Sequence, residues 1–182
     1  MIRIAVCGSH STGKTTLLDG LAAELSKQGI RNRIAPEPIR ALEGRLAGAS
    51  LTDRYLLLVG EHLRRLDTET CDALLLDRTL MDLRVYLGFE QQPPPALTEM
   101  VDELLRWYVG RIDLWFYLPI EIPLVPDGRR PPGEAHRRDV DASLCRLAKT
   151  LGLPLVEIRG GPAQRVAMVL KHLEGRLGTE KR

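Results

Sequence analysis

Short apolar runs alternate along the chain with longer segments in which leucines recur at helical spacing. Each run is bounded by glycine, proline or polar residues, as is typical of buried strands, and the runs lie at residues 2–7, 31–35, 73–77, 113–118 and 153–158. Apolar positions three and four residues apart predict helices at residues 14–27, 51–67, 80–87, 96–109, 134–151 and 163–177. This alternation predicts an α/β fold: a five-stranded parallel sheet with helices on both faces and right-handed crossovers. Ligands bind such sheets at the carboxyl ends of the strands.

The chain of 182 residues shows no internal repeat, low-complexity tract or glycine- and serine-rich linker. We therefore expect a single domain over residues 1–178, followed by a frayed end at residues 179–182. Aromatic residues gather at one helix–strand joint, and we predict core packing for them rather than a base-stacking platform. They are Trp107, Tyr108, Trp115, Phe116 and Tyr117.

The composition excludes several classes of protein. The net charge of +2 is too balanced to indicate a nucleic-acid or membrane-surface partner, and no apolar stretch is long enough for a membrane span. The three cysteines are widely spaced without a Cys-x-x-Cys pair, which disfavours a disulfide framework or structural zinc and fits a reducing compartment. Because the first residues lack the layout of a signal peptide, the sequence predicts a cytoplasmic protein. It leaves the oligomeric state open, with a homodimer among the alternatives.

Residues 8–15, here called the phosphate loop, match the pattern G-x-x-x-x-G-K-[S/T] between a predicted strand and a predicted helix. Glycines let successive N–H groups point at phosphate oxygens, and the positive end of the following helix strengthens that field. The pattern predicts that Lys14 reaches the β- and γ-phosphates of ATP and that the Thr15 hydroxyl binds Mg²⁺. The nucleotide-binding set is Gly8, Ser9, His10, Ser11, Thr12, Gly13, Lys14, Thr15 and Thr16.

Asp77 ends the third predicted strand, where a second magnesium-binding carboxylate is expected. The next residue is Arg78 and not the second acid that a motor-type ATPase uses to activate water. A cation there would stabilise the negative charge of a phosphoryl group during its transfer, so we expect a catalytic role for Arg78. The competing interpretation is that the two residues only cap the following helix and pair with a neighbour. A guanine-specific Asn-Lys-x-Asp motif is excluded, because the sole asparagine, Asn32, precedes Arg33.

Three segments, at residues 8–17, 37–40 and 77–82, together resemble P-loop kinases related to the NadR-type ribosylnicotinamide kinase domain. More distantly, they are similar to deoxynucleoside and thymidylate kinases. The resemblance spans nearly the whole chain, although only the phosphate loop is highly specific. In the deoxynucleoside kinases a glutamate after the second strand accepts the proton of the substrate hydroxyl, and an acid–arginine pair follows the third strand. Glu37 and the pair Asp77–Arg78 match these positions, so the resemblance implies that Glu37 is a general base.

Further residues are candidates for binding the phosphoryl acceptor. Arg40 lies one turn after Glu37, where it would hold an acceptor anion or form a surface ion pair with Glu37. Asp82 and Tyr86 share one face of the helix after Asp77 and are candidates for the same pocket. Ordinary helix surface is the competing interpretation for these two.

An arginine-rich segment at about residues 127–139 is predicted to form a lid over the transferring phosphate. It contains Arg129, Arg130, Arg137 and Arg138. We expect Arg137 to act in catalysis and Arg129 to bind the nucleotide, while a solvated basic loop is the alternative. Gly160, in the turn after the last strand, is expected at the edge of the adenine site.

These features predict an ATP- and Mg²⁺-dependent kinase that acts on the hydroxyl group of a nucleoside or similar metabolite. Two alternatives remain open from the sequence. In a nucleoside monophosphate kinase, Arg40 and the arginine-rich segment would hold the acceptor phosphate. In a nucleotide-binding regulatory switch, hydrolysis would be slow and no acceptor would be used.

Overall fold

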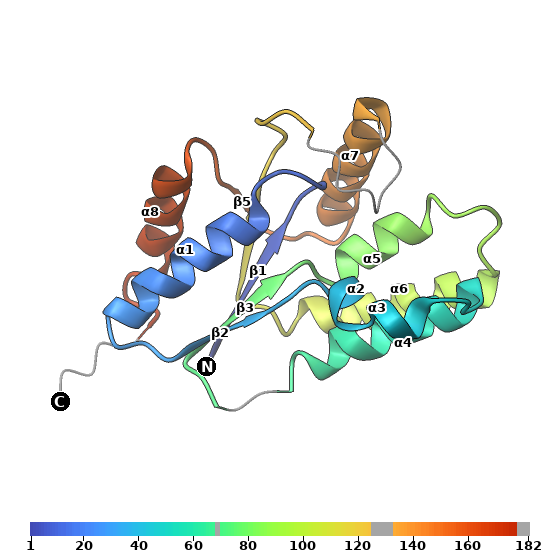
Figure 1. Ribbon diagram of the computed structural model, residues 1–182, viewed down its shortest axis with the longest axis horizontal. Coiled ribbons are helices and arrows are strands. Elements are labelled where there is room, and N and C mark those ends of the chain that lie inside the picture. Colours follow the sequence, from blue (N-terminus) through green and yellow to red (C-terminus); the bar gives the residue numbers. More distant parts are fainter. Residues whose placement is uncertain (68–69, 125–132, 178–182) are drawn as a thin grey trace.

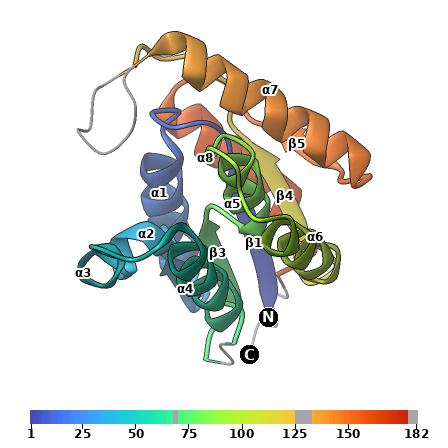
Figure 2. The same ribbon diagram turned by 90° about the vertical axis from the view of Figure 1, so that its right-hand side faces the viewer.

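A computed structural model describes residues 1–67, 70–124 and 133–177 of the chain. Within these residues, five strands form one parallel sheet in the order β2-β3-β1-β4-β5. The strands are β1 (Ile2–Cys7), β2 (Asn32–Ala35), β3 (Ala73–Asp77), β4 (Leu114–Tyr117) and β5 (Leu155–Glu157). The central strand β1 pairs with β3 on one side and with β4 on the other (Figures 1 and 2). The carboxyl ends of β1, β2 and β3 therefore lie along one edge, where the candidate residues follow them.

Helices cover both faces of the sheet, as Figures 1 and 2 show. On one face α1 (Lys14–Lys27) and α8 (Pro162–Leu173) pack against Ile4 and Val6 of β1. On the other face Ala5 and Cys7 of β1 lie beneath four helices, because successive side chains of a strand point to opposite faces. These helices are α4 (Leu51–Arg64), α5 (Leu80–Leu87), α6 (Pro95–Val109) and α7 (Glu134–Thr150). The predicted fold class is confirmed.

Two short helices follow β2 that the hydrophobic pattern does not predict, α2 (Pro38–Ala41) and α3 (Glu43–Leu46). Each is a single turn, too short for a helical period to be visible in the sequence. The longer helix α4 begins where its capping box predicts, since the Ser50 side chain accepts a hydrogen bond from the backbone N–H of Asp53.

One core prediction is wrong. Trp107 is 47% exposed, and the Arg111 guanidinium lies 3.5 Å from its ring centroid. It occupies the solvent side of α6, whereas Leu105 and Tyr108 of the same helix are buried. The other four aromatic residues of the joint are buried as predicted.

Among the described residues, no helix combines the length and the apolar character that crossing a membrane requires. Residues 178–182, which include the predicted frayed end, lie outside the described part of the chain.

Candidate active site

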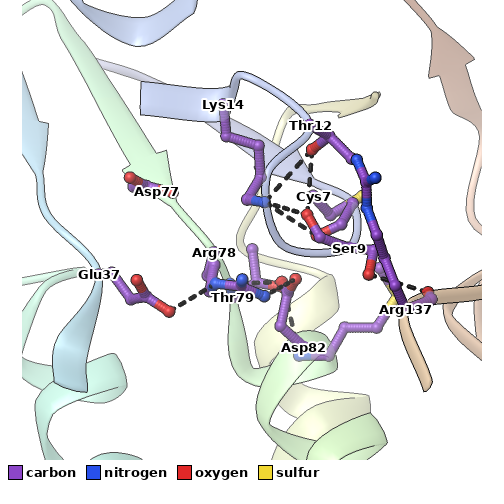
Figure 3. A network of polar contacts seen from close by, with 12 residues as sticks. Cys7, Ser9, Thr12, Lys14, Glu37, Asp77, Arg78, Thr79, Asp82 and Arg137 are labelled. Carbon is purple, nitrogen blue, oxygen red and sulfur yellow. Dashed lines mark hydrogen bonds and ion pairs between the residues drawn. The ribbon is translucent and has the colours of Figure 1, made fainter. Parts of the chain in front are cut away.

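The phosphate loop joins the carboxyl end of β1 to the first turn of α1 (Figure 3). Gly8 has a φ of 143°, and a Cβ atom there would lie 2.5 Å from the carbonyl oxygen of Leu118. Gly13 has a φ of 87°, in the left-handed region, and a Cβ atom would lie 3.0 Å from Nη1 of Arg165. Both positions therefore favour glycine for their backbone conformation, and Gly8 requires it for space as well.

The Lys14 side chain curls back into the loop. Its Nζ donates to the carbonyl oxygens of Gly8 at 3.0 Å and Ser9 at 2.5 Å, and lies 3.4 Å from Oγ1 of Thr12. The side chain is buried rather than open to solvent. Burial, together with the positive charge of Arg78, lowers the pKa of Lys14 to about 7.

This low pKa leads to a testable pH dependence. Above pH 7 the amine of the free protein is mostly neutral, whereas bound phosphates favour the charged ammonium. ATP binding is therefore expected to take up a proton at Lys14, approaching one proton per ATP at about pH 8 and near zero at about pH 6. Isothermal titration in buffers of different ionisation enthalpy measures this uptake. The same uptake at pH 8 in Lys14→Ala would assign it to another group.

Two buried arginines hold the phosphate loop from outside. Arg137 of α7 donates through Nε to the carbonyl of His10 at 3.0 Å and through Nη2 to that of Ser11 at 2.8 Å. Arg165 of α8 donates through Nη1 to the carbonyl of Thr12 at 2.6 Å. Because C=O and N–H of a trans peptide point in opposite directions, these bonds turn the following N–H groups away from the arginines. The loop is thus preorganised as an anion site.

This arrangement differs from the lid that the sequence predicts for Arg137. Arg137 is completely buried against the phosphate loop, so in this conformation it braces the loop, and a contact with the transferring phosphate stays a prediction. Arg138 is exposed on α7. Arg129 and Arg130 lie outside the described residues, together with the rest of residues 127–132 of the predicted lid.

Thr15 and Asp77 meet across the start of α1 and the end of β3. The Thr15 hydroxyl donates to Oδ2 of Asp77 at 2.9 Å. A hydroxyl and a carboxylate are oxygen ligands of the kind that Mg²⁺ prefers, and magnesium sites commonly use one or two protein ligands with substrate phosphates. The pair therefore fits the magnesium site expected from the sequence.

Arg78 stands at the centre of the site (Figure 3). Its φ of 64° is rare for any residue except glycine. Its Nε lies 2.7 Å from Oε1 of Glu37, and its Nη1 lies 3.4 Å from Oδ1 of Asp82. The guanidinium carbon lies 5.3 Å from the centre of the Tyr86 ring. Burial lowers the pKa of Arg78, but Tyr86 and the carboxylates more than offset this and hold the pKa above its ordinary value.

The cap of α5 is formed by Thr79 and Asp82. The backbone N–H of Thr79 donates to Oδ2 of Asp82 at 2.8 Å, and the Thr79 side chain accepts from the N–H of Met81. Asp77 and Arg78 therefore do not cap α5, although both pair with neighbours, Asp77 with Thr15 and Arg78 with Glu37 and Asp82. Asp82 is buried rather than on the helix surface, and this burial raises the pKa of its carboxyl group.

A cavity of about 360 Å³ opens beside this cluster. Its walls combine aromatic and apolar side chains with a few charged ones, and they include the acceptor candidates Glu37, Asp82 and Tyr86 as well as Arg78. The remaining lining residues are Pro38, Ile39, Arg54, Tyr55, Leu58, His62, Leu83, Phe89, Glu90 and His136.

Several of these lining residues are not evident from the sequence. Tyr55, Leu58 and His62 lie on one face of α4, and that spacing is equally typical of a core-facing helix. Arg40, which the sequence places at the acceptor, is not among the described residues that line the cavity. Its Nε lies 3.7 Å from Oε2 of Glu37, and its side chain is half exposed.

The turn after β5 is tied to the phosphate loop through a glutamate. The N–H of Gly160 donates to Oε2 of Glu121 at 3.0 Å, and the same oxygen accepts from Nη2 of Arg165 at 2.8 Å. Because Arg165 also holds Thr12, the turn and the loop are joined in one network. A contact between Gly160 and adenine remains a prediction.

A family model described as AAA domain matches residues 3–165. No curated protein matches the chain. Among solved structures, NadR protein in complex with NR is similar over 100% of this chain and 52% of its own, with a TM-score of 0.71 and 22% identity. A NadR complex with NAD and AMP-PNP shows the same TM-score at 23% identity. The chain thus spans about half the length of NadR.

A second kind of solved structure is similar over its full length. The structure of deoxyadenosine kinase from M.mycoides with bound dATP is similar over 96% of this chain and over 100% of the kinase chain. The TM-score is 0.66 and the identity 14%. At such identities these similarities establish the fold. They agree with the resemblance to P-loop kinases that the sequence motifs indicate.

Proposed function

We propose that this chain, which belongs to the AAA domain family, is a kinase that transfers a phosphoryl group from ATP to a hydroxyl group of a nucleoside or similar metabolite. The observation that carries this proposal is the ion pair between Glu37 Oε1 and Arg78 Nε, 2.7 Å apart, at the wall of the apolar cavity. It places a carboxylate and a guanidinium together beside the phosphate loop. A hydroxyl acceptor needs a base, and a transferring phosphoryl group needs a positive charge.

Glu37 is the proposed general base. Its carboxylate accepts the proton of the acceptor hydroxyl while the hydroxyl oxygen forms a bond to the γ-phosphorus and the bond from that phosphorus to the bridging oxygen of ADP breaks. Lys14 and Arg78 face the charge that develops on the transferring oxygens. The apolar walls exclude water, which would otherwise compete with the acceptor.

Thr15 and Asp77 would hold Mg²⁺ through the hydroxyl and carboxylate that meet at 2.9 Å. When bound, the metal neutralises charge on the β- and γ-phosphates. The residues of the chain supply the remaining functions: the phosphate loop binds and orients the phosphates, and Arg137 and Arg165 keep its peptide groups in place.

The charges around the cavity favour an unphosphorylated acceptor. Of the residues that the structure describes, three with carboxyl groups line it, Glu37, Asp82 and Glu90, against the guanidinium groups of Arg54 and Arg78. Arg78 already faces two of these carboxylates. Among the described residues, a phosphate dianion would therefore meet more carboxyl groups than guanidinium groups, which disfavours the nucleoside monophosphate kinase. Tyr86, Phe89 and Tyr55 supply aromatic surface suited to a flat ring.

Acceptor-dependent formation of ADP tests the proposal. The protein is incubated with MgATP and, separately, ribosylnicotinamide, ribonucleosides, deoxynucleosides and their monophosphates. We expect stimulation by at least one unphosphorylated compound and formation of its monophosphate. Stimulation by monophosphates alone would instead support the monophosphate kinase, and no stimulation by any compound would support the switch. The cytoplasmic location and the lack of a nucleic-acid partner remain predictions from composition.

Substitutions of the neighbours Asp77 and Arg78 should separate two functions. Asp77→Asn removes a charged metal ligand and is expected to raise the Mg²⁺ concentration needed for half-maximal rate by about tenfold or more. Arg78→Ala should leave this requirement nearly unchanged and lower kcat by about 10²-fold or more. Rates measured over a magnesium series compare the two variants. Equal effects of both substitutions on both quantities would contradict the assigned functions.

A further inference from the structure

Arg65 is a buried cation that the proposed chemistry leaves unused. It follows the last residue of α4, and only 2% of its surface is exposed. Within the described ranges, no carboxylate lies within ion-pair distance of its guanidinium. Burial lowers its pKa, yet arginine stays charged in proteins, so the buried charge must be stabilised by other groups.

Main-chain carbonyl oxygens at the ends of two strands stabilise this buried charge. Nη2 of Arg65 donates to the carbonyl of Ala35 at 2.7 Å, to that of Asp77 at 2.9 Å and to that of Arg78 at 3.3 Å. Ala35 ends β2, two residues before Glu37, and Asp77 ends β3. One guanidinium thus joins the two strand ends that carry the proposed base and the proposed catalytic arginine.

The bond to Arg78 falls at a strained residue. With φ at 64°, the Arg78 backbone occupies a conformation that residues other than glycine keep only when their surroundings hold it. Its N–H donates to the carbonyl of Val6 at 3.3 Å, and its own carbonyl accepts from Arg65. Loss of the second bond would let the backbone relax and move the Arg78 side chain away from Glu37.

Arg65 also contacts the cavity through His62. Nη1 of Arg65 lies 3.3 Å from Nδ1 of His62, and His62 lines the cavity. A guanidinium has only donors, so Nδ1 must be the acceptor and the neutral ring carries its proton on Nε2. In this state His62 is an N–H donor with a fixed tautomer at the buried wall of the cavity.

We propose that Arg65 is a positioning residue that holds Arg78 in its left-handed backbone conformation and keeps the His62 ring in its Nε2–H form. The effect on Arg78 rests on the proposed kinase function, whereas the state of His62 does not. Arg65 itself touches no reacting atom and acts through these two residues.

The first test is a double-mutant cycle on kcat with the acceptor that ADP formation identifies. Arg65→Lys keeps the charge but not the fork that reaches two strand ends and His62. It is expected to lower kcat about 10–100-fold, with the KM for ATP within about threefold. In an Arg78→Ala background the same change should alter kcat by less than about threefold, since no side chain remains to be positioned.

The same kcat measurements include a control variant. Arg3→Lys is the matched control, because Arg3 also donates from its guanidinium to a main-chain carbonyl, that of Leu66, and we expect its kcat to be unchanged. Thermal unfolding verifies that each variant is folded at the assay temperature. An unchanged kcat in Arg65→Lys, or an equal loss with and without Arg78, would overturn positioning through Arg78.

The second test does not depend on any acceptor. In ¹⁵N-labelled protein, the His62 ring is expected to show an unprotonated Nδ1 and a protonated Nε2 between about pH 5.5 and 8, since burial also lowers its pKa. In Arg65→Met this tautomer preference should be lost. A proton on Nδ1 in the wild-type protein would overturn the proposed contact, even if that variant failed to fold. If no acceptor is phosphorylated, the kinase proposal fails while this measurement still decides the state of His62.

Discussion

Replacing Glu37 by glutamine is expected to lower kcat by about 10²–10⁴-fold while the affinity for ATP stays nearly unchanged. Glutamine keeps the size of the side chain and its hydrogen-bonding capacity but does not accept the proton of a hydroxyl acceptor. It also removes the charge that faces Arg78 across 2.7 Å. Steady-state rates at saturating ATP, together with direct measurement of ATP binding, check both parts.

The same substitution distinguishes the two kinds of acceptor. A phosphate acceptor is already ionised and needs no strong base, so Glu37→Gln would then cost little. Arg40→Ala would in that case raise the acceptor KM sharply by removing an anion partner. For a hydroxyl acceptor we expect Arg40→Ala to have a small effect, because this side chain is half exposed and lies 3.7 Å from Glu37. A modest loss in Glu37→Gln with a large one in Arg40→Ala would refute the hydroxyl acceptor.

Lys14→Ala is expected to lower the rate of phosphoryl transfer by about 10²–10³-fold or more. The ammonium lies inside the main-chain cradle of the loop, where it donates to the carbonyls of Gly8 and Ser9. Its loss leaves the departing phosphoryl group without that charge. Because burial disfavours the charged form of Lys14, the variant should not unfold at a lower temperature than the wild type by more than a few degrees.

Lys27→Ala is the matched control for this result. Lys27 ends the same helix and pairs with Glu24 at an exposed site, where an ion pair contributes little. Its rate and unfolding temperature should match those of the wild type. Near wild-type turnover in Lys14→Ala would mean that the phosphate loop does not take part in transfer.

The fold and the phosphate loop follow from the sequence because both depend on local rules. The strand and helix periods are visible within single segments, and the predicted sheet with two covered faces is confirmed. Gly8 and Gly13 were recognisable because only glycine tolerates their backbone angles. The cap at Ser50 is equally local. The one-turn helix α2 after β2 was not predictable, since one turn shows no period.

The acceptor side was only partly predictable. The sequence places Glu37 and Arg78 at the ends of neighbouring strands, since parallel strands end at one edge. It cannot rank the partners of Glu37, and by proximity along the chain Arg40 is the obvious one. The structure shows the closer contact to Arg78, because pairing of β2 with β3 brings the two strand ends together.

By itself, then, the sequence determined the order of the elements, the sheet they form, the position of the phosphate loop and the strand ends that carry the candidate chemistry. Only the tertiary structure decided what the buried arginines do. Arg65, Arg137 and Arg165 all donate to main-chain carbonyls. Because every residue has such a carbonyl, the residue types in the sequence do not indicate these acceptors. Arginine side chains are long, and their partners are set by how helices pack at the carboxyl edge of the sheet. The reason is physical: a buried guanidinium is stabilised by whichever oxygens the fold brings within its reach.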